Sequence, residues 1–165
     1  MASKPDTSKL AIVKTFFLVG DKNLNAKIMP KLSPLGVQPK KLVEEVNKVA
    51  KEWEGIRIYI EFHVQNREAK IKLVIGTSAH IVKAMNGAKY RDRKKEKLPN
   101  RSGNLPFSKI LSIAKLIHEE GRSLSKDLSG TVKQVLGTCL TMGCTVDGNS
   151  PKVITEQIMK GEIQI

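Results

Sequence analysis

Apolar and polar residues alternate along two neighbouring segments in the first half of the chain. Residues 56–64 carry an apolar side chain at every second position, and residues 69–75 repeat this pattern after a turn at 65–68. Alternation with a period of two is typical of a strand with one buried face, so the two segments predict a β-hairpin. An apolar run at 10–19, rich in β-branched and aromatic residues, predicts a further, well-covered strand.

A helix is predicted between the first strand and the hairpin. Pro39 suits the first turn of a helix, and the apolar residues after it recur at helical spacing as far as Ala50. One helix packed on a three-stranded antiparallel sheet makes a complete small α+β domain. We therefore expect an N-terminal domain over residues 1–75 and a hinge at 76–78.

Three prolines, Pro30, Pro34 and Pro39, occur in the segment before this helix. Proline fixes its own φ and restricts the residue before it, so we expect residues 29–41 to be extended and stiff. The segment can be interpreted as a rigid loop that only joins strand to helix. It can also be interpreted as a preformed ridge that meets a partner without a cost in ordering.

The second half of the chain has helical periodicity. Helices are predicted to begin near Ser78, Pro106, Ser129 and Pro151, and Gly161 closes the last of them. We therefore expect residues 79–165 to form an all-helical C-terminal domain, so that the chain as a whole belongs to the α+β class.

The helix predicted over 129–143 has two very different faces. At about 100° per residue, one side forms the hydrophobic stripe of a core helix, with Val132, Val135, Leu136, Cys139 and Met142. The other side carries Gly130, Gln134, Gly137, Thr138 and Thr141. A glycine inside a helix costs about 1 kcal/mol relative to alanine, so this face is kept small at the expense of stability. Either a large partner approaches the backbone and bonds to the hydroxyls, or a neighbouring helix packs tightly on the glycines.

The charge of the chain favours the first of these interpretations. The 165 residues include 29 Lys and Arg against 16 Asp and Glu, a net charge of +13, which favours a polyanionic partner such as nucleic acid. Seven cationic residues against two acidic ones lie within 89–101. Long polar loops are uncommon in compact domains unless they are functional, so we interpret this one as a phosphate clamp beside the helix face. Aromatic residues make up only 4% of the chain, which argues against a module that stacks single-stranded bases.

Other classes of function have little support. Cys139 and Cys144 are poorly placed for a disulfide, which indicates a reducing cytosol, and the three histidines lack metal-ligand spacing. No apolar run approaches the length of a membrane span, and the N-terminus lacks the apolar stretch of a signal peptide. Nucleotide-binding loops, nucleophile motifs and carboxylate pairs are not apparent. We therefore expect no enzyme activity, no cofactor, no metal and no membrane association.

Six segments of the chain resemble the large-subunit ribosomal protein L11 family in its eukaryotic form. They follow one another in the family's order and span nearly the whole chain: PKLSPLGVQPKK at 30–41, WEGIRI at 53–58, QNREAKI at 65–71, YRDRKKEK at 90–97, LSGTVKQVLGT at 128–138 and MGCTVDG at 142–148. The resemblance implies a two-domain protein at the base of the ribosomal stalk, in cytoplasmic ribosomes.

The resemblance also implies partners and site residues. The C-terminal domain would bind folded large-subunit rRNA of the GTPase-associated centre, near an acidic stalk protein. The segment with Pro30, Pro34 and Pro39 would face the site where translational GTPases dock transiently. The residues predicted to contact rRNA are Lys89, Arg91, Arg93, Lys94, Lys95, Lys97, Arg101, Ser129, Gly130, Thr131, Lys133, Gln134, Gly137, Thr138 and Thr141.

The residues themselves leave alternatives open. A basic helical domain could bind DNA, although a helix that reads bases usually offers Arg, Lys, Asn or Gln, and this face offers mainly Gly and Thr. A non-ribosomal RNA-binding adaptor, or an adaptor that uses the basic loop on acidic proteins, is the other alternative.

Overall fold

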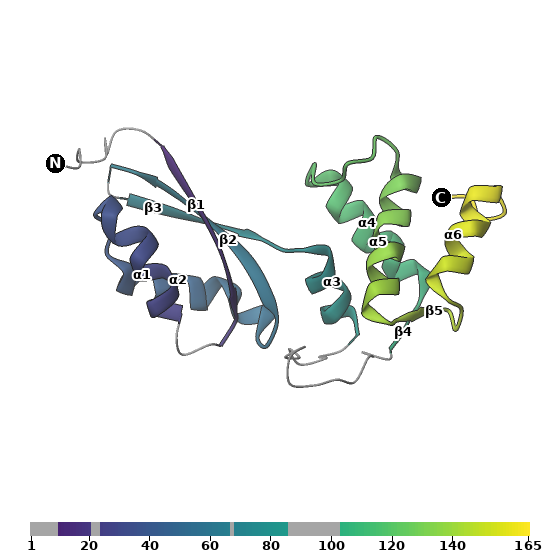
Figure 1. Cartoon of the computed structure of the whole chain (residues 1–165), viewed down its shortest axis with the longest axis horizontal. Coiled ribbons are helices and arrows are strands. Elements are labelled where there is room, and N and C mark those ends of the chain that lie inside the picture. Colours follow the sequence, from purple (N-terminus) through teal and green to yellow (C-terminus); the bar gives the residue numbers. More distant parts are fainter. Residues whose placement is uncertain (1–9, 21–23, 67, 86–102) are drawn as a thin grey trace. The chain divides into compact units, whose positions relative to one another are not determined.

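The chain divides into two compact units, with the boundary between Gly76 and Thr77. The computed structural model describes residues 10–20, 24–66, 68–85 and 103–165 (Figure 1). Helix α3 spans Thr77–Ala84. Thr77 and Ser78, which the sequence placed in a hinge, therefore lie in the first turn of α3.

The N-terminal unit is built on a three-stranded antiparallel sheet in the order β1-β2-β3. Its strands are β1 (Ala11–Leu18), β2 (Arg57–Gln65) and β3 (Glu68–Val74). The register places Phe62 of β2 opposite Val13 of β1 and Ile71 of β3. Alternate residues of β2 are buried, so the hairpin predicted from the alternating pattern is confirmed.

Two helices lie beside this sheet, where the sequence predicted one. Helix α1 spans Leu24–Leu32, and helix α2 spans Pro39–Ala50. A 3₁₀ turn at Ser33–Leu35 follows α1, and another at Lys51–Trp53 follows α2.

The expectation that residues 29–41 are extended was wrong. Pro30 lies inside α1, Pro34 lies in the first 3₁₀ turn, and Pro39 is the first residue of α2. Pro34 and Pro39 are tolerated because the N–H groups in the first turn of a helix have no partner in the helix. Gly36, with φ 71°, ends the 3₁₀ turn in the left-handed conformation.

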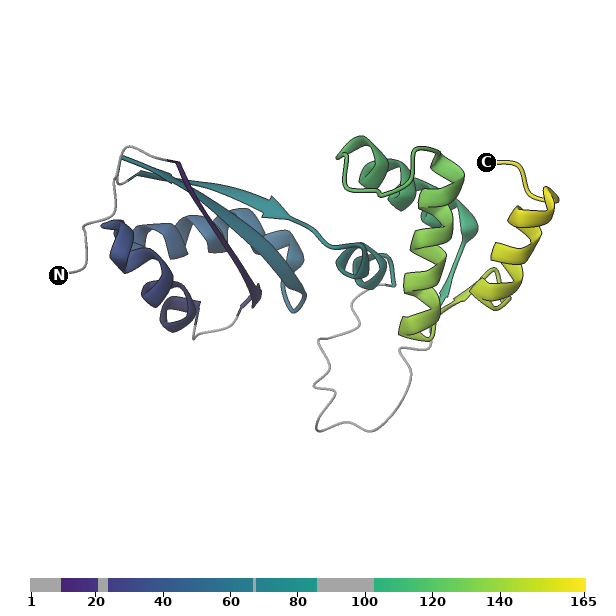
Figure 2. The same cartoon turned by 45° about the horizontal axis from the view of Figure 1, so that its top comes forward.

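The core of the N-terminal unit lies between the sheet and its two helices. Figures 1 and 2 show α1 and α2 on the same face of the sheet. The largest side chains that are fully buried there come from all these elements except β3: Phe17, Ile28, Leu32, Val46, Ile58, Ile60 and Phe62. The opposite face of the sheet is left exposed or half-buried.

The C-terminal unit contains four helices in its described residues. They are α3, α4 (Phe107–Glu119), α5 (Leu128–Met142) and α6 (Pro151–Lys160). A short parallel pair, β4 (Asn104–Leu105) and β5 (Thr145–Val146), joins the segment before α4 to the segment after α5. The all-helical expectation is therefore corrected, since two-residue strands are too short to show alternation. No helix of the described ranges has the length and apolar character needed to cross a membrane.

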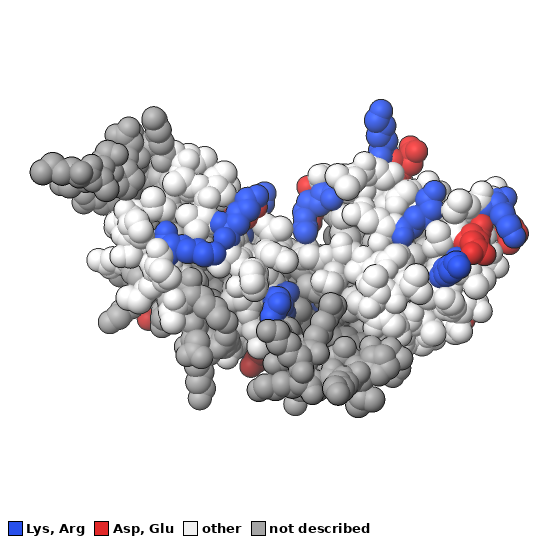
Figure 3. All heavy atoms as spheres, in the orientation of Figure 1, with Lys and Arg blue, Asp and Glu red and all other residues white. Residues whose placement is uncertain are grey.

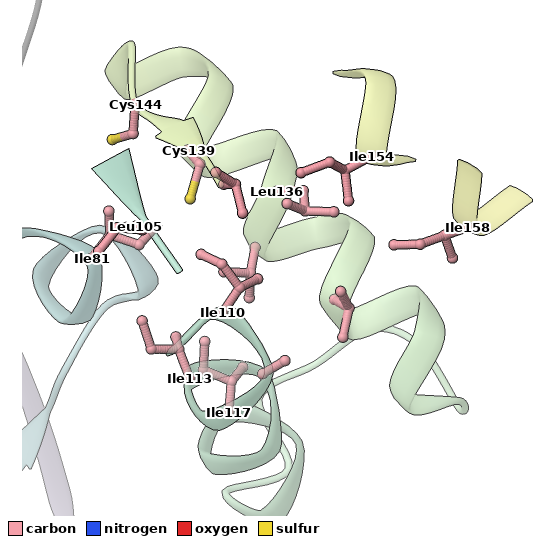
Figure 4. Packing of buried hydrophobic residues seen from close by; sticks show 14 residues of the cluster. Ile81, Leu105, Ile110, Ile113, Ile117, Leu136, Cys139, Cys144, Ile154 and Ile158 are labelled. Carbon is pink, nitrogen blue, oxygen red and sulfur yellow. The ribbon is translucent and has the colours of Figure 1, made fainter. Parts of the chain in front are cut away.

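The core of this unit is almost entirely aliphatic and surrounds one side of α5. Figure 4 shows isoleucines of α3, α4 and α6 converging on that side. Cys139 and Cys144 lie in the same core as free thiols. A hydrogen bond with Cys144, together with burial, raises the pKa of Cys139, which makes this thiol unreactive.

Leu136→Ala removes a fully buried side chain from the centre of α5. We expect the free energy of unfolding of the C-terminal unit to fall by about 2–5 kcal/mol, because a cavity replaces the lost contacts. Leu140→Ala is the matched control, since Leu140 is 50% exposed on the same helix, and it should cost less than about 0.5 kcal/mol. Urea denaturation, followed by NMR signals of α5, measures both. Equal losses would contradict this assignment of the core.

Candidate RNA-binding surface

The outward side of α5 is the candidate surface. Val132, Val135, Leu136 and Cys139 are buried, whereas Gln134, Gly137, Leu140 and Thr141 are exposed and Thr138 is half-buried. The helix ends at Gly143, whose φ of 77° lets its N–H bond back to the carbonyl oxygens of Cys139 and Leu140. Because the stripe of buried residues is fixed in the core, the other side of the helix must face outward.

Gly137 has open space around it. A Cβ atom placed on Gly137 would have no heavy atom of the described residues within 4 Å. Tight packing of a neighbouring helix therefore does not account for this glycine within the C-terminal unit. The remaining interpretation is that the position is kept small for a partner outside the unit.

Gly130 is small for a different reason. A Cβ atom there would lie 2.7 Å from Cβ of Ser125 and would also overlap the Ser125 hydroxyl oxygen. Ser125 belongs to the loop between α4 and α5, and its hydroxyl accepts a hydrogen bond from the N–H of Asp127. Gly130 is therefore required by packing against the loop, whereas Gly137 is not required by any such contact with a described residue.

Thr131 was predicted to contact RNA, and its burial contradicts that prediction. Its side chain is fully buried. Its hydroxyl lies 2.7 Å from Oγ of Ser123 and 3.2 Å from Nδ1 of His118, and it donates to the carbonyl oxygen of Asp127 at 3.4 Å. The hydroxyl therefore holds the α4–α5 loop against both helices. Sequence periodicity missed this role because Thr131 sits beside the core stripe, and a loop covers it only in the folded unit.

The hydroxyls of Thr138 and Thr141 both donate their proton to a backbone carbonyl oxygen of α5. Thr138 donates to the carbonyl oxygen of Gln134 at 3.1 Å, and Thr141 donates to that of Thr138 at 2.8 Å. With its proton engaged on the backbone, each hydroxyl can offer only its oxygen to a partner. These two hydroxyls are therefore suited to accept hydrogen bonds, from ribose hydroxyls or base amino groups, and not to donate them.

The remaining predicted residues of α5 occupy the border of this surface. Ser129 and Lys133 are half-buried, and Gln134 is exposed with its side-chain oxygen 3.4 Å from Oγ of Ser123. Lys133 is the only cationic residue of α5. Leu140, three residues after Gly137, also lies on this face, and the period of the helix could have revealed it.

Most of the predicted cationic contacts lie outside the described residues. These are Lys89, Arg91, Arg93, Lys94, Lys95, Lys97 and Arg101. The positions that flank this segment are described: Gly103 accepts a hydrogen bond of 2.9 Å from the N–H of Thr145, and the Cys144 thiol donates to the Met85 sulfur at 3.3 Å. Both flanks therefore meet just beyond the C-terminal end of α5, near Thr141.

The charge of the described surface is spread over both units. Figure 3 shows Lys and Arg side chains on each unit in that view. No group of three or more His, Cys, Asp or Glu residues in the described parts of the chain could hold a metal ion. Burial lowers the pKa of His80, so this half-buried ring carries little charge at neutral pH.

Comparison with known proteins gives consistent results. The family model described as ribosomal protein L11, RNA binding domain, matches residues 76–146, which include α3, α4, α5 and both short strands. The chain is 42% identical to large ribosomal subunit protein uL11x of Arabidopsis thaliana, with 100% of this chain and 98% of the relative covered. It is 40% identical to uL11A of Schizosaccharomyces pombe, with 93% of each chain covered.

Gly137→Ala should separate stability from binding. Because the position is open, the substitution should leave the unit as stable or stabilise it by up to about 1 kcal/mol through helix propensity. Its methyl group should nevertheless weaken binding of structured rRNA, as measured by filter binding.

Gly130→Ala is the matched comparison on the same helix. Contact with Ser125 should destabilise the unit by about 1–3 kcal/mol, as overpacking does. If Gly137→Ala instead melted the unit while the folded fraction bound RNA normally, the α5 face would be a packing surface.

Thr141→Val keeps the shape of the side chain and removes its acceptor oxygen. We expect rRNA binding to weaken by about 1–3 kcal/mol if a donor on the RNA loses its partner. Thr141→Ser retains the hydroxyl and should bind as the unchanged protein does. Equal affinity of the valine and serine variants in the same titration would show that this hydroxyl makes no contact.

Proposed function

This chain belongs to the ribosomal protein L11 family, and we propose that it binds folded rRNA at the base of the ribosomal stalk and helps to form the docking site for translational GTPases. Its family places it in the large ribosomal subunit as a structural protein and not as an enzyme. The position within the subunit and the residues that contact RNA are the parts we propose.

The open space at Gly137 is the observation that carries the RNA contact. An exposed glycine in the middle of a helix has no local benefit, and none of the described residues of its own unit packs there. The adjacent acceptors of Thr138 and Thr141 suit RNA, whose 2′-hydroxyl groups can donate. In this proposal, shape and acceptors come from α5, and phosphate contacts come from the cationic residues of 89–101.

The N-terminal unit is proposed to face the translational GTPases. Pro30 and Pro34 are exposed, at the end of α1 and in the following 3₁₀ turn, whereas the side chain of Pro39 is not described. These residues form a helical ridge in place of the extended one that the sequence predicted. The ridge is preformed in the free unit, so binding a factor would carry little ordering cost. An acidic stalk protein is the further partner we propose, as suits a chain of net charge +13.

A DNA-binding function is less well supported by the same surface. Readout of bases in the major groove uses side chains such as Arg, Lys, Asn and Gln. The outward side of α5 offers only Gln134, with Lys133 at its border. A comparison of duplex DNA with structured rRNA in filter binding tests this alternative, and preference for duplex DNA would overturn the proposal.

Association with ribosomes is the direct test of the proposed position. The native protein should sediment with large ribosomal subunits, and cross-links from Thr141→Cys should fall on the rRNA of the stalk base. Cross-links to another region of the rRNA would leave the family intact and overturn the stalk-base proposal.

Neutralising Arg91, Arg93, Lys94 and Lys95 should weaken binding to many RNAs and flatten its dependence on salt. Each lost phosphate contact removes released counterions, about 0.7–0.9 in the slope of log K against log salt. The matched control changes four exposed lysines elsewhere, Lys48, Lys51, Lys152 and Lys160, to glutamine. An equal slope for both variants would show that net charge, and not the position of these four residues, determines the affinity.

A further inference from the structure

The exposed face of the N-terminal sheet is a second surface with a distinct chemistry. Its side chains alternate with the buried ones, and the strand register arranges them in rows across the sheet. The first row is Ile12, His63 and Lys70. The second is Lys14, Glu61 and Lys72. The third is Phe16, Tyr59 and Val74. Helices α1 and α2 lie on the other face, so neither covers these rows (Figures 1 and 2).

Two aromatic rings lie side by side in the third row. Phe16 of β1 pairs directly with Tyr59 of β2, their ring centroids are 6.0 Å apart, and the ring planes are inclined by 58°. Phe16 is 53% exposed and Tyr59 is 50% exposed. The guanidinium of Arg57 lies over the Phe16 ring, 5.3 Å from its centroid. Large aromatic side chains left this exposed together, with a planar cation beside them, are typical of a binding surface.

Three lysines lie on the same face, in the two rows next to the aromatic row. Lys14, Lys70 and Lys72 are exposed, and Lys14 remains 71% exposed although its Nζ lies 2.8 Å from Glu61. Glu61 is the only carboxylate within the three rows, and the hydrogen bond from Lys14 lowers its pKa. Glu61 is therefore already paired at neutral pH, and the other lysines are left to attract an anion.

Rings and cations on neighbouring strands suit unpaired nucleotides. Single-stranded RNA is bound through bases that stack on aromatic side chains or on arginine planes, while lysines contact the phosphates. An acidic peptide would also be attracted by the lysines. However, its carboxylates would lie beside aromatic ring faces, which carry partial negative charge. The arrangement therefore favours RNA over an acidic peptide.

We propose that this sheet face binds a short stretch of unpaired RNA. One base stacks on Tyr59, a neighbouring base stacks on the paired Arg57 and Phe16 side chains, and the intervening phosphates contact Lys72 and Lys70. The site lies in the other unit from the α5 surface and recognises a different form of RNA. The low aromatic content of the chain argued against such a site, but two of its seven aromatic residues lie together on one face.

NMR titration of the full-length protein locates the site. The probe is an eight-nucleotide oligouridine, and the control is an oligonucleotide of the same length and charge without bases. Oligouridine should shift the amide signals of Phe16, Tyr59 and their neighbours on β1 and β2, and the abasic control should do so far less. Equal shifts with both probes would overturn the proposal, because the face would then bind phosphate alone.

Substitutions distinguish stacking from general apolar contact. Phe16→Leu and Tyr59→Leu keep apolar side chains but remove the rings, and each should weaken oligouridine binding about tenfold. Ile12→Ala is the matched control: Ile12 is 50% exposed on the same face and has no ring, so its loss should change affinity less than about twofold. If Ile12→Ala weakened binding as much as the ring substitutions, stacking would be ruled out.

Two further measurements keep this proposal separate from the rRNA contact of α5. The ring variants should bind structured rRNA as the unchanged protein does, whereas Gly137→Ala should bind oligouridine normally. Circular dichroism verifies that each variant is folded. Tighter binding of a glutamate-rich peptide than of oligouridine at the same sheet face would overturn the RNA proposal and identify a protein partner.

Discussion

Burial of the aliphatic side of α5 is the interaction on which the C-terminal unit depends. This helix packs against α3, α4 and α6, and its buried stripe occupies the centre of their common core. Each buried aliphatic side chain contributes about 1.5–3 kcal/mol. A glycine at position 137 costs about 1 kcal/mol, which is small beside that sum. Packing on one side of α5 therefore allows the other side to be selected for contact with a partner and not for helix stability.

The loop before α5 shows how a small polar network can complete such an arrangement. Thr131 joins Ser123 and His118, and Gly130 leaves room for Ser125, so the loop is held against the first turn of α5. Buried polar groups stabilise only when they are satisfied, and here one hydroxyl meets several partners. The start of α5 is thus fixed by hydrogen bonds between Thr131 of the helix and side chains of α4 and the loop.

Much of the fold follows from local patterns in the sequence. Alternation located the hairpin and helical periodicity located the buried stripe of α5, because one face of each element meets a core. Three features had no such local pattern. Helix α1 contains Pro30, the β4–β5 pair is two residues long in each strand, and the burial of Thr131 requires a loop that returns from α4. For the candidate site, the sequence indicated Gly137, Thr138 and Thr141, but it could not distinguish the causes of the two glycines.

The hydrogen bond between Gly103 and Thr145 has a consequence for variation of this protein. Together with the contact between Met85 and Cys144, it brings both flanks of the segment 86–102 to one place in the folded unit. Residues can then be inserted between the flanks without moving any element of the core. The entropy of closing a chain between two fixed points rises slowly, by about 0.6 kcal/mol for each doubling of its length. The length and charge of this segment can therefore diverge in evolution, or be exchanged by design, while the core residues stay the same.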